Sequence, residues 1–108
     1  MPVGDKMYYK NMTNLEEVME KLTDLKSELK KLYKVREMGL FGSWVRGEQN
    51  AKSDLDVVVE FEEGADLFDW IGLGLYLEDI FGCPVDIVSR NTLRQELKDT
   101  ILEHMVKV

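Results

Sequence analysis

The sequence predicts an α/β fold in which helices pack on a small sheet. Patterns typical of helices and of strands alternate along the chain, one strand-like run is rich in β-branched residues, and no repeat, low-complexity tract or linker interrupts the order. A chain of 108 residues is long enough for one domain with a modest core. We therefore expect a single domain over residues 1–108, with residues 1–13 as an irregular lead.

The first predicted helix has the clearest pattern. Thr13 and Glu16 stand at the spacing of a capping box, and apolar residues then recur at helical spacing through about residue 33. A short strand of mixed polarity should follow over residues 35–41. Residues 43–52 are expected to form a brief helix and then a polar loop. The apolar residues of the first helix are Leu15, Val18, Met19, Leu22, Leu25, Leu29 and Leu32.

Residues 54–61 predict a strand whose two faces differ. Side chains alternate between the faces of a strand, so one face carries only large apolar residues and should be fully buried. The other face carries most of the polar residues of this run. The apolar face comprises Leu55, Val57, Val59 and Phe61, and the other comprises Asp54, Asp56, Val58 and Glu60.

Three further elements complete the predicted order. Residues 62–64 should form a turn, and residues 66–81 predict an amphipathic helix that Gly82 ends. Residues 84–89 predict a third strand, and residues 91–95 begin a last helix. We expect the helix over 66–81 to turn inward its residues Leu67, Phe68, Ile71, Leu75 and Ile80, while the last helix carries Leu97, Ile101, Leu102 and Met105.

Charge and composition argue against several classes of protein. The net charge is −7, and residues 54–81 contain nine acidic residues and no Lys or Arg, a surface that repels a long phosphate backbone. Generic nucleic-acid binding is therefore disfavoured, whereas a metal–nucleotide complex or a basic protein partner fits.

No apolar stretch approaches the roughly 18 residues of a membrane span, and the polar N-terminus lacks the core of a signal peptide. We expect no membrane association and a cytoplasmic location. A single cysteine and a single histidine argue against a disulfide and a structural zinc site.

The spacing between a Gly-Ser pair and an Asp-x-Asp pair is the most informative feature. Gly42 and Ser43 leave a predicted strand and open a short helix, where free backbone N–H groups and a hydroxyl suit a phosphate. After a gap of ten residues, Asp54 and Asp56 begin the next strand, whose period of two points both carboxylates to one face. Two carboxylates beside a phosphate site can hold Mg²⁺ on a nucleoside triphosphate.

A third carboxylate, Asp86, lies inside the apolar third strand. Its desolvation there is costly unless it is paired, protonated or metal-bound, and pairing with Arg36 or Arg90 is one alternative. If the third strand neighbours the second, Asp86 can join Asp54 and Asp56. Three carboxylates so close together repel one another strongly without a cation. Two Mg²⁺ ions held this way could activate an attacking hydroxyl and stabilise a leaving pyrophosphate.

These residues resemble the minimal nucleotidyltransferases of the polymerase β superfamily, which include the MntA-like antitoxins found beside HEPN toxins. The hallmark is the Gly-Ser pair, the ten-residue gap, the Asp-x-Asp pair and a later Asp on a following strand. A longer local match adds Arg46, Gly47 and Ser53, whereas Val45 stands where the family usually has a smaller residue. The resemblance runs from the first predicted helix to the last. It implies a polymerase-β-like nucleotidyltransferase core, a small mixed sheet flanked by helices.

The resemblance also implies a reaction, the transfer of a nucleoside monophosphate, AMP from ATP, to an acceptor hydroxyl. Asp54 and Asp56 would hold two metal ions, Mg²⁺ or alternatively Mn²⁺, and Asp86 would bind the catalytic metal and help to deprotonate the acceptor. Gly42 and Ser43 would hold the β- and γ-phosphates. The expected acceptor is a tyrosine of a HEPN-type toxin, with this chain as the antitoxin. A second copy of the chain is the alternative partner that could complete the cleft.

Several assignments stay open. Arg46 could contact a phosphate or form a salt bridge that holds the short helix on the sheet, and Lys52 could reach the triphosphate or face solvent. Trp44 and Trp70 could stack on a base or pack in the core or at an interface. His104 has no carboxylate or cysteine at ligand spacing and receives no role. A different class of function is a non-catalytic antitoxin or scaffold that binds nucleotide and acts by partner binding alone. Nucleotide addition to RNA is weakened by the acidic surface.

Overall fold

A four-stranded mixed sheet forms the centre of the computed structural model, which describes residues 15–47 and 54–108. The strands are β1 (Val35–Phe41), β2 (Leu55–Phe61), β3 (Val85–Ser89) and β4 (Val106–Lys107), in the order β3-β2-β1-β4. Strands β2 and β3 are parallel, whereas β1 pairs antiparallel with β2 and with β4. The predicted α/β class and the mixed sheet are therefore confirmed. The expected lead over residues 1–13 and the Thr13 cap lie outside the described residues.

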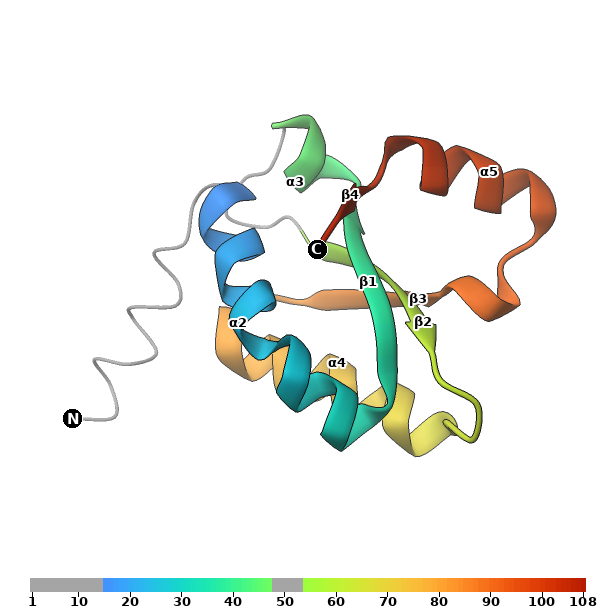
Figure 1. Ribbon diagram of the computed structural model, residues 1–108. Coiled ribbons are helices and arrows are strands. Elements are labelled where there is room, and N and C mark those ends of the chain that lie inside the picture. The colour runs from blue at the N-terminus through green and yellow to red at the C-terminus, as the bar shows by residue number, and fades with distance from the viewer. Residues whose placement is uncertain (1–14, 48–53) are drawn as a thin grey trace.

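Two helices, α2 (Leu15–Tyr33) and α4 (Leu67–Phe81), cover one face of the sheet (Figure 1). Most of the predicted apolar stripe of α2 is confirmed, because residues at its third or fourth positions from Val18 to Leu29 are buried, whereas Leu32 is exposed. Most of the predicted buried face of β2 is confirmed as well, whereas Phe61 is only half-buried. The core under these helices contains Val18, Leu22, Leu25, Leu29, Met38, Leu40, Leu55, Val57, Val59, Leu73 and Leu77.

The orientation predicted for α4 is wrong. The side chains expected to point inward are exposed, with fractions of 63% for Leu67, 83% for Phe68, 51% for Ile71 and 62% for Leu75, and only Ile80 packs against the core. The residues that are buried instead are Leu73, Leu77 and Phe81.

The composition of α4 explains the error. The helix is apolar around most of its circumference, so its periodicity does not select a face. The side of α4 that packs against α2 is marked instead by a glycine, Gly72. A Cβ on Gly72 would lie 2.7 Å from the ring of Tyr33, so the absence of a side chain at Gly72 allows α2 to pack closely against α4. The ends of α4 are as predicted, since Asp66 caps its first turn and accepts a hydrogen bond from Asp69 N, while Gly82 ends it at φ 68°.

The other face of the sheet is covered by the C-terminal part of the chain. A 3₁₀ turn, η1 (Arg90–Thr92), leads into α5 (Gln95–His104), and the chain then enters β4. The last helix is therefore shorter than predicted, because Met105 already has an extended backbone. Met105 packs on β1, where a Cβ on Gly39 would lie only 2.9 Å from its Sδ atom. This covering layer also explains why Val58, on the predicted polar face, is buried.

The short helix α3 (Ser43–Arg46) follows β1 directly and ends at Gly47, whose φ is 72°. It matches the predicted brief helix, while the polar loop that should follow lies outside the described residues from residue 48 to residue 53. Among the helices of the described ranges, none combines the length and the apolar character needed to cross a bilayer.

Candidate active site

Asp56 and Asp86 face each other across the two parallel strands. Asp56 of β2 is the register partner of Asp86 of β3, between the pairs Leu55–Val85 and Val57–Ile87. Register partners on neighbouring strands project to the same side of a sheet, and here that side is opposite to buried Val57. Asp54 directly precedes β2 and is close enough for its charge to act on Asp56. The structure thus brings the three predicted carboxylates to one end of the β2–β3 pair.

The three carboxylates influence one another electrostatically. Asp56 is half-buried, and its burial raises the pKa of its carboxyl group above the ordinary value. The negative charges of Asp86 and then Asp54 raise this pKa further, while the positive charge of Arg46 opposes the shift. Asp54 and Asp86 themselves are exposed. A divalent cation between these groups would remove the repulsion and favour the ionised form of Asp56.

The protein alone does not supply a complete metal site in the described ranges, since there no three His, Cys, Asp or Glu side chains gather closely enough to hold an ion. Mg²⁺, however, is commonly bound by one or two carboxylates, with water and substrate phosphates as its other ligands. Asp56 and Asp86 fit that smaller role, because their oxygens lie on one face of adjacent strands. The donor set is therefore compatible with an ion that arrives with a nucleotide.

Gly42 forms the turn between β1 and α3, directly beside Asp56. Its backbone has φ 80°, and a Cβ there would lie 2.1 Å from Oδ2 of Asp56. The backbone N–H groups of Val45 and Arg46 both donate to the carbonyl oxygen of Gly42, each at 3.2 Å. Gly42 therefore occupies the N-cap position, and Ser43 is the first residue of the helix rather than its cap.

A cavity of about 330 Å³ opens next to this turn. Its near wall comes from the end of β1 and from α3, and its far wall comes from α5. Since Gly42 belongs both to this wall and to the contact with Asp56, the cavity adjoins the carboxylates. The cavity is lined by Phe41, Gly42, Val45, Arg46, Thr100, Ile101 and His104.

The far wall has no signature in the sequence. Thr100 and His104 belong to no motif, and His104 has no carboxylate or cysteine at ligand spacing. Their position beside Arg46 follows from the path of the chain through η1 and α5, which no local pattern reports. Arg46 is exposed on the near wall, and its charge favours the ionised form of Asp56. Lys52 lies outside the described residues.

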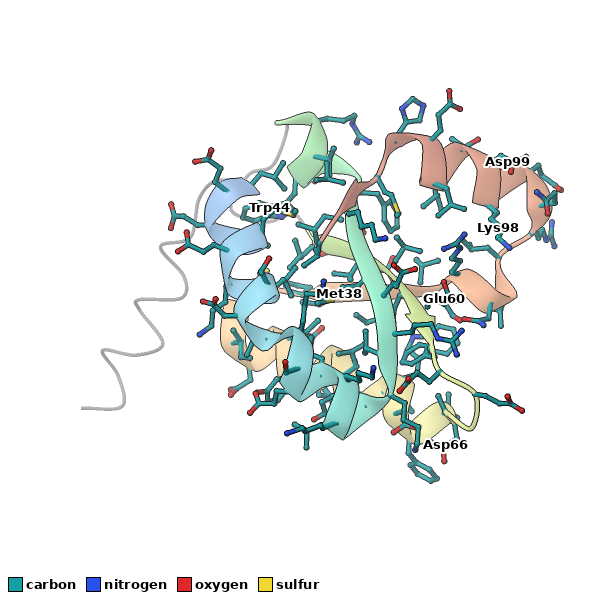
Figure 2. The ribbon with its side chains drawn as sticks, in the orientation of Figure 1. Met38, Trp44, Glu60, Asp66, Lys98 and Asp99 are labelled. Carbon is teal, nitrogen blue, oxygen red and sulfur yellow. The ribbon has the colours of Figure 1, made fainter. Side chains whose placement is uncertain are left out.

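The arginines and tryptophans for which a role in the site was an alternative have structural roles. The guanidinium groups of Arg36 and Arg90 both contact Glu60, at 3.3 and 3.1 Å, so the alternative pairing partners considered for Asp86 are engaged elsewhere. Trp44 packs in the core beside α2 (Figure 2). The indole Nε1 of Trp70 donates to the carbonyl oxygen of Ile87 at 3.0 Å, so this ring also has a packing role.

Comparison with known proteins decides the family. Residues 22–108 match the nucleotidyltransferase domain family. The chain belongs to this family. The nucleotidyltransferase domain is 43% identical over 97 residues to the protein adenylyltransferase MntA of Thermococcus cleftensis, covering 90% of this chain and 98% of that protein.

Solved structures agree with this assignment. A structure described as a candidate minimal nucleotidyltransferase is 35% identical, with a TM-score of 0.78, and the match covers 91% of this nucleotidyltransferase domain and 99% of that chain. A complex of a tri-AMPylated Shewanella oneidensis HEPN toxin with its MNT antitoxin contains a chain of the same fold, with a TM-score of 0.60 at 18% identity, covering 94% of this chain and 70% of that one. The resemblance to minimal nucleotidyltransferases is confirmed, and the chain is a transferase by class.

Proposed function

We propose that this nucleotidyltransferase domain transfers AMP from ATP to a hydroxyl group of a protein partner, and that the partner is a HEPN-type toxin for which the chain is the antitoxin. The observation that carries the proposal is the placement of Asp56 opposite Asp86, with Asp54 close enough for its charge to act on Asp56 and the Gly42 turn in contact with Asp56. The name of the Thermococcus relative and the AMPylated toxin bound to an MNT antitoxin of the same fold support the choice of acceptor.

The proposed reaction is a single in-line displacement at the α-phosphorus of ATP. The acceptor oxygen forms a bond to this phosphorus, the bond to the bridging oxygen of the β-phosphate breaks, and pyrophosphate leaves. Asp86 receives the proton of the acceptor hydroxyl, directly or through water, since its exposed carboxylate can reach an incoming substrate. Proximity and neutralisation of charge supply the acceleration, and no covalent enzyme intermediate is needed.

The other residues bind and orient the triphosphate. Asp54 and Asp56 would hold two metal ions, Mg²⁺ or Mn²⁺, and Asp86 would also bind the catalytic ion. Metal held there would supply charge neutralisation for the phosphates and would make the attacking hydroxyl more acidic. Gly42 and Ser43 approach the β- and γ-phosphates through backbone N–H groups, while Arg46 and Lys52 add positive charge. The cavity between α3 and α5 receives the nucleoside of ATP, because it is adjacent to Gly42 and its volume suits a group of that size.

The proposal is tested by incubating the chain with ATP labelled at its α-phosphate, Mg²⁺ and the HEPN-type protein encoded beside it. Label should enter a tyrosine of that protein, and Asp86→Asn should reduce the rate by a factor of roughly 10²–10⁴ if Asp86 accepts the proton. Equal incorporation by the variant and the wild type would show that the assigned roles are wrong. Circular dichroism of both proteins excludes loss of the fold as the cause.

A second candidate function is a non-catalytic antitoxin that binds its partner and uses the nucleotide only as a signal. The acidic surface favours it, since the whole run from Asp54 to Ser89 lacks Lys and Arg and would attract a basic ribonuclease. Toxicity in cells separates the two candidates. If Asp54→Asn still neutralises the toxin as well as the wild type does, binding alone suffices. If neutralisation disappears while complex formation remains, the transfer reaction is required.

A further inference from the structure

The exposed side of α4 carries four large apolar side chains, Leu67, Phe68, Ile71 and Leu75, each more than half exposed. At 3.6 residues per turn these positions fall within an arc of about 100° on one side of the helix. The side chains that reach the core are on the other side. We call the four residues the outer face of α4. Single exposed apolar residues are common, but a continuous stripe of this size marks an interaction site.

We propose that the outer face of α4 is a docking surface for another protein, and that the docked element is a helix with an apolar face flanked by Lys and Arg. The face is separate from the candidate active site, since α4 covers the side of the sheet opposite to Asp56 (Figure 1). The inference concerns binding only, so it does not depend on the transfer reaction.

The charges around the outer face identify the kind of partner. Glu63 and Asp66 stand at its N-terminal end, and Glu78 and Asp79 at its C-terminal end, where the helix has no basic residue. The carboxylate of Glu78 also accepts a hydrogen bond from the backbone N–H of Val85. Figure 2 shows Asp66 at the start of α4. An apolar stripe with carboxylates at both ends is complementary to an amphipathic helix with basic flanks.

Two lysines of α2 and the following turn, Lys30 and Lys34, do not neutralise the four carboxylates at the ends of the outer face. The Nζ atom of Lys34 lies 3.2 Å from Asp69, and that of Lys30 lies 4.0 Å from Glu62. Both are thus engaged with carboxylates other than the four that border the outer face. A docked basic helix would therefore meet acidic groups that these lysines do not already pair.

A second copy of this chain fits the outer face less well. Two copies of α4 placed side by side would bring the same carboxylates together, and α4 has no basic residue to offset them. Like charges at an interface suppress that pairing. A heterologous partner with basic flanks removes the conflict.

A groove extends the docking surface beyond the first turn of α4. It has a volume of about 650 Å³, and Leu67 belongs both to its lining and to the outer face. The aromatic rings of Phe61 and Trp70 also line it, together with Arg36, Glu62, Glu63 and Asp66. The guanidinium group of Arg36 is paired with Glu60 at 3.3 Å, so the groove, like the outer face, combines apolar side chains with carboxylates. It gives a docked helix room to continue past the end of α4.

The test uses a defined probe, a helical peptide of about 18 residues with leucines on one face and lysines beside them. A matched peptide has glutamates in place of the lysines. Fluorescence anisotropy measures the binding of each peptide to the full chain, to Ile71→Glu and to Phe68→Glu. The control is Leu97→Glu, which places the same charge on an exposed apolar position of α5.

The lysine peptide should bind the wild type and Leu97→Glu equally and more weakly at high salt, and the two α4 variants should lose about tenfold or more in affinity. The glutamate peptide should not bind. Equal losses in Leu97→Glu and in the α4 variants would overturn the proposal, as would equal binding of both peptides or failure of the lysine peptide to bind. Sedimentation equilibrium tests whether a second copy of the chain occupies the outer face instead. A dimer of the wild type that Ile71→Glu dissociates would assign the face to a second copy and would also overturn the proposal.

Discussion

The carboxylate of Asp56 occupies the space that a side chain at residue 42 would need. A Cβ at Gly42 would lie 2.1 Å from Oδ2 of Asp56. This contact joins the turn that opens α3 to the strand that carries the acidic pair. Residue 42 must be a glycine for two reasons. Its φ is positive, at 80°, and the Asp56 carboxylate leaves no space for a side chain. The phosphate-binding turn and the metal-binding strand of the proposed reaction are thus one packed unit.

The substitution Gly42→Ala should therefore abolish transfer rather than merely weaken the fold. The new methyl group displaces Asp56, and the positive φ adds a strain of about 1–3 kcal/mol. A loss of about 100-fold or more in label transfer is expected, together with a lower melting temperature. Gly47→Ala is the matched control, because Gly47 has φ 72° but nothing within 4 Å of its Cβ position. That variant should lose stability and keep most of its activity. Equal activity losses in both would mean that strain alone is responsible.

The raised pKa of Asp56 predicts a stability that depends on pH. Burial and the charges of Asp86 and Asp54 make ionisation of Asp56 less favourable in the folded chain than in the unfolded chain. The folded state therefore holds the proton more tightly, and the resulting destabilisation is complete above the folded pKa and absent below the unfolded pKa. Asp56→Asn should raise the melting temperature at pH 7, and the gain should shrink toward about pH 4, where the unfolded carboxyl is itself partly protonated.

Thermal unfolding followed by circular dichroism across this pH range measures the effect. Asp24→Asn, at an exposed position on α2, changes the net charge by the same amount and serves as the control. A gain in Asp56→Asn that is independent of pH, or equal to that of Asp24→Asn, would contradict the assignment. The stabilised variant should also be inactive, which is the expected trade-off when like charges are concentrated for function.

The cavity between α3 and α5 gives a prediction about nucleotide affinity. Ile101→Trp should fill part of the space beside Phe41 and weaken the binding of ATP by about tenfold, through loss of contacts with the nucleoside. Leu97→Trp makes the same change on an exposed turn of α5 and should leave binding unaltered. Titration of a fluorescent ATP analogue compares the two variants. If Ile101→Trp binds as the wild type does, the nucleoside lies elsewhere.

Much of the fold could be predicted from the sequence where a single period dominates. The apolar stripe of α2 has polar residues on its other sides, so its period points to one face. Alternation in β2 placed Leu55, Val57 and Val59 in the core. The face on which Asp56 lies followed from the same alternation, and the position of Asp86 opposite it required only that β3 neighbour β2.

Other features have no local signal. Helix α4 is apolar on both sides, so its period could not decide between Ile71 and Leu73, and only the close approach of Tyr33 to Gly72 reveals the packed side. Strand β4 has two residues, too few for a pattern, and its pairing with Gly39 and Leu40 depends on the whole C-terminal path. The wall that α5 contributes to the cavity depends on the same path.

The central claim is that Asp54, Asp56 and Asp86 bind a nucleotide together with a divalent cation. Isothermal titration calorimetry with an ATP analogue that has a methylene bridge between its α- and β-phosphates tests it most directly, in Mg²⁺ and in EDTA. We predict binding by the wild type in Mg²⁺ and an affinity lower by about tenfold or more both in EDTA and in Asp86→Asn. The same affinity with and without Mg²⁺, unaltered in Asp86→Asn, would contradict the claim.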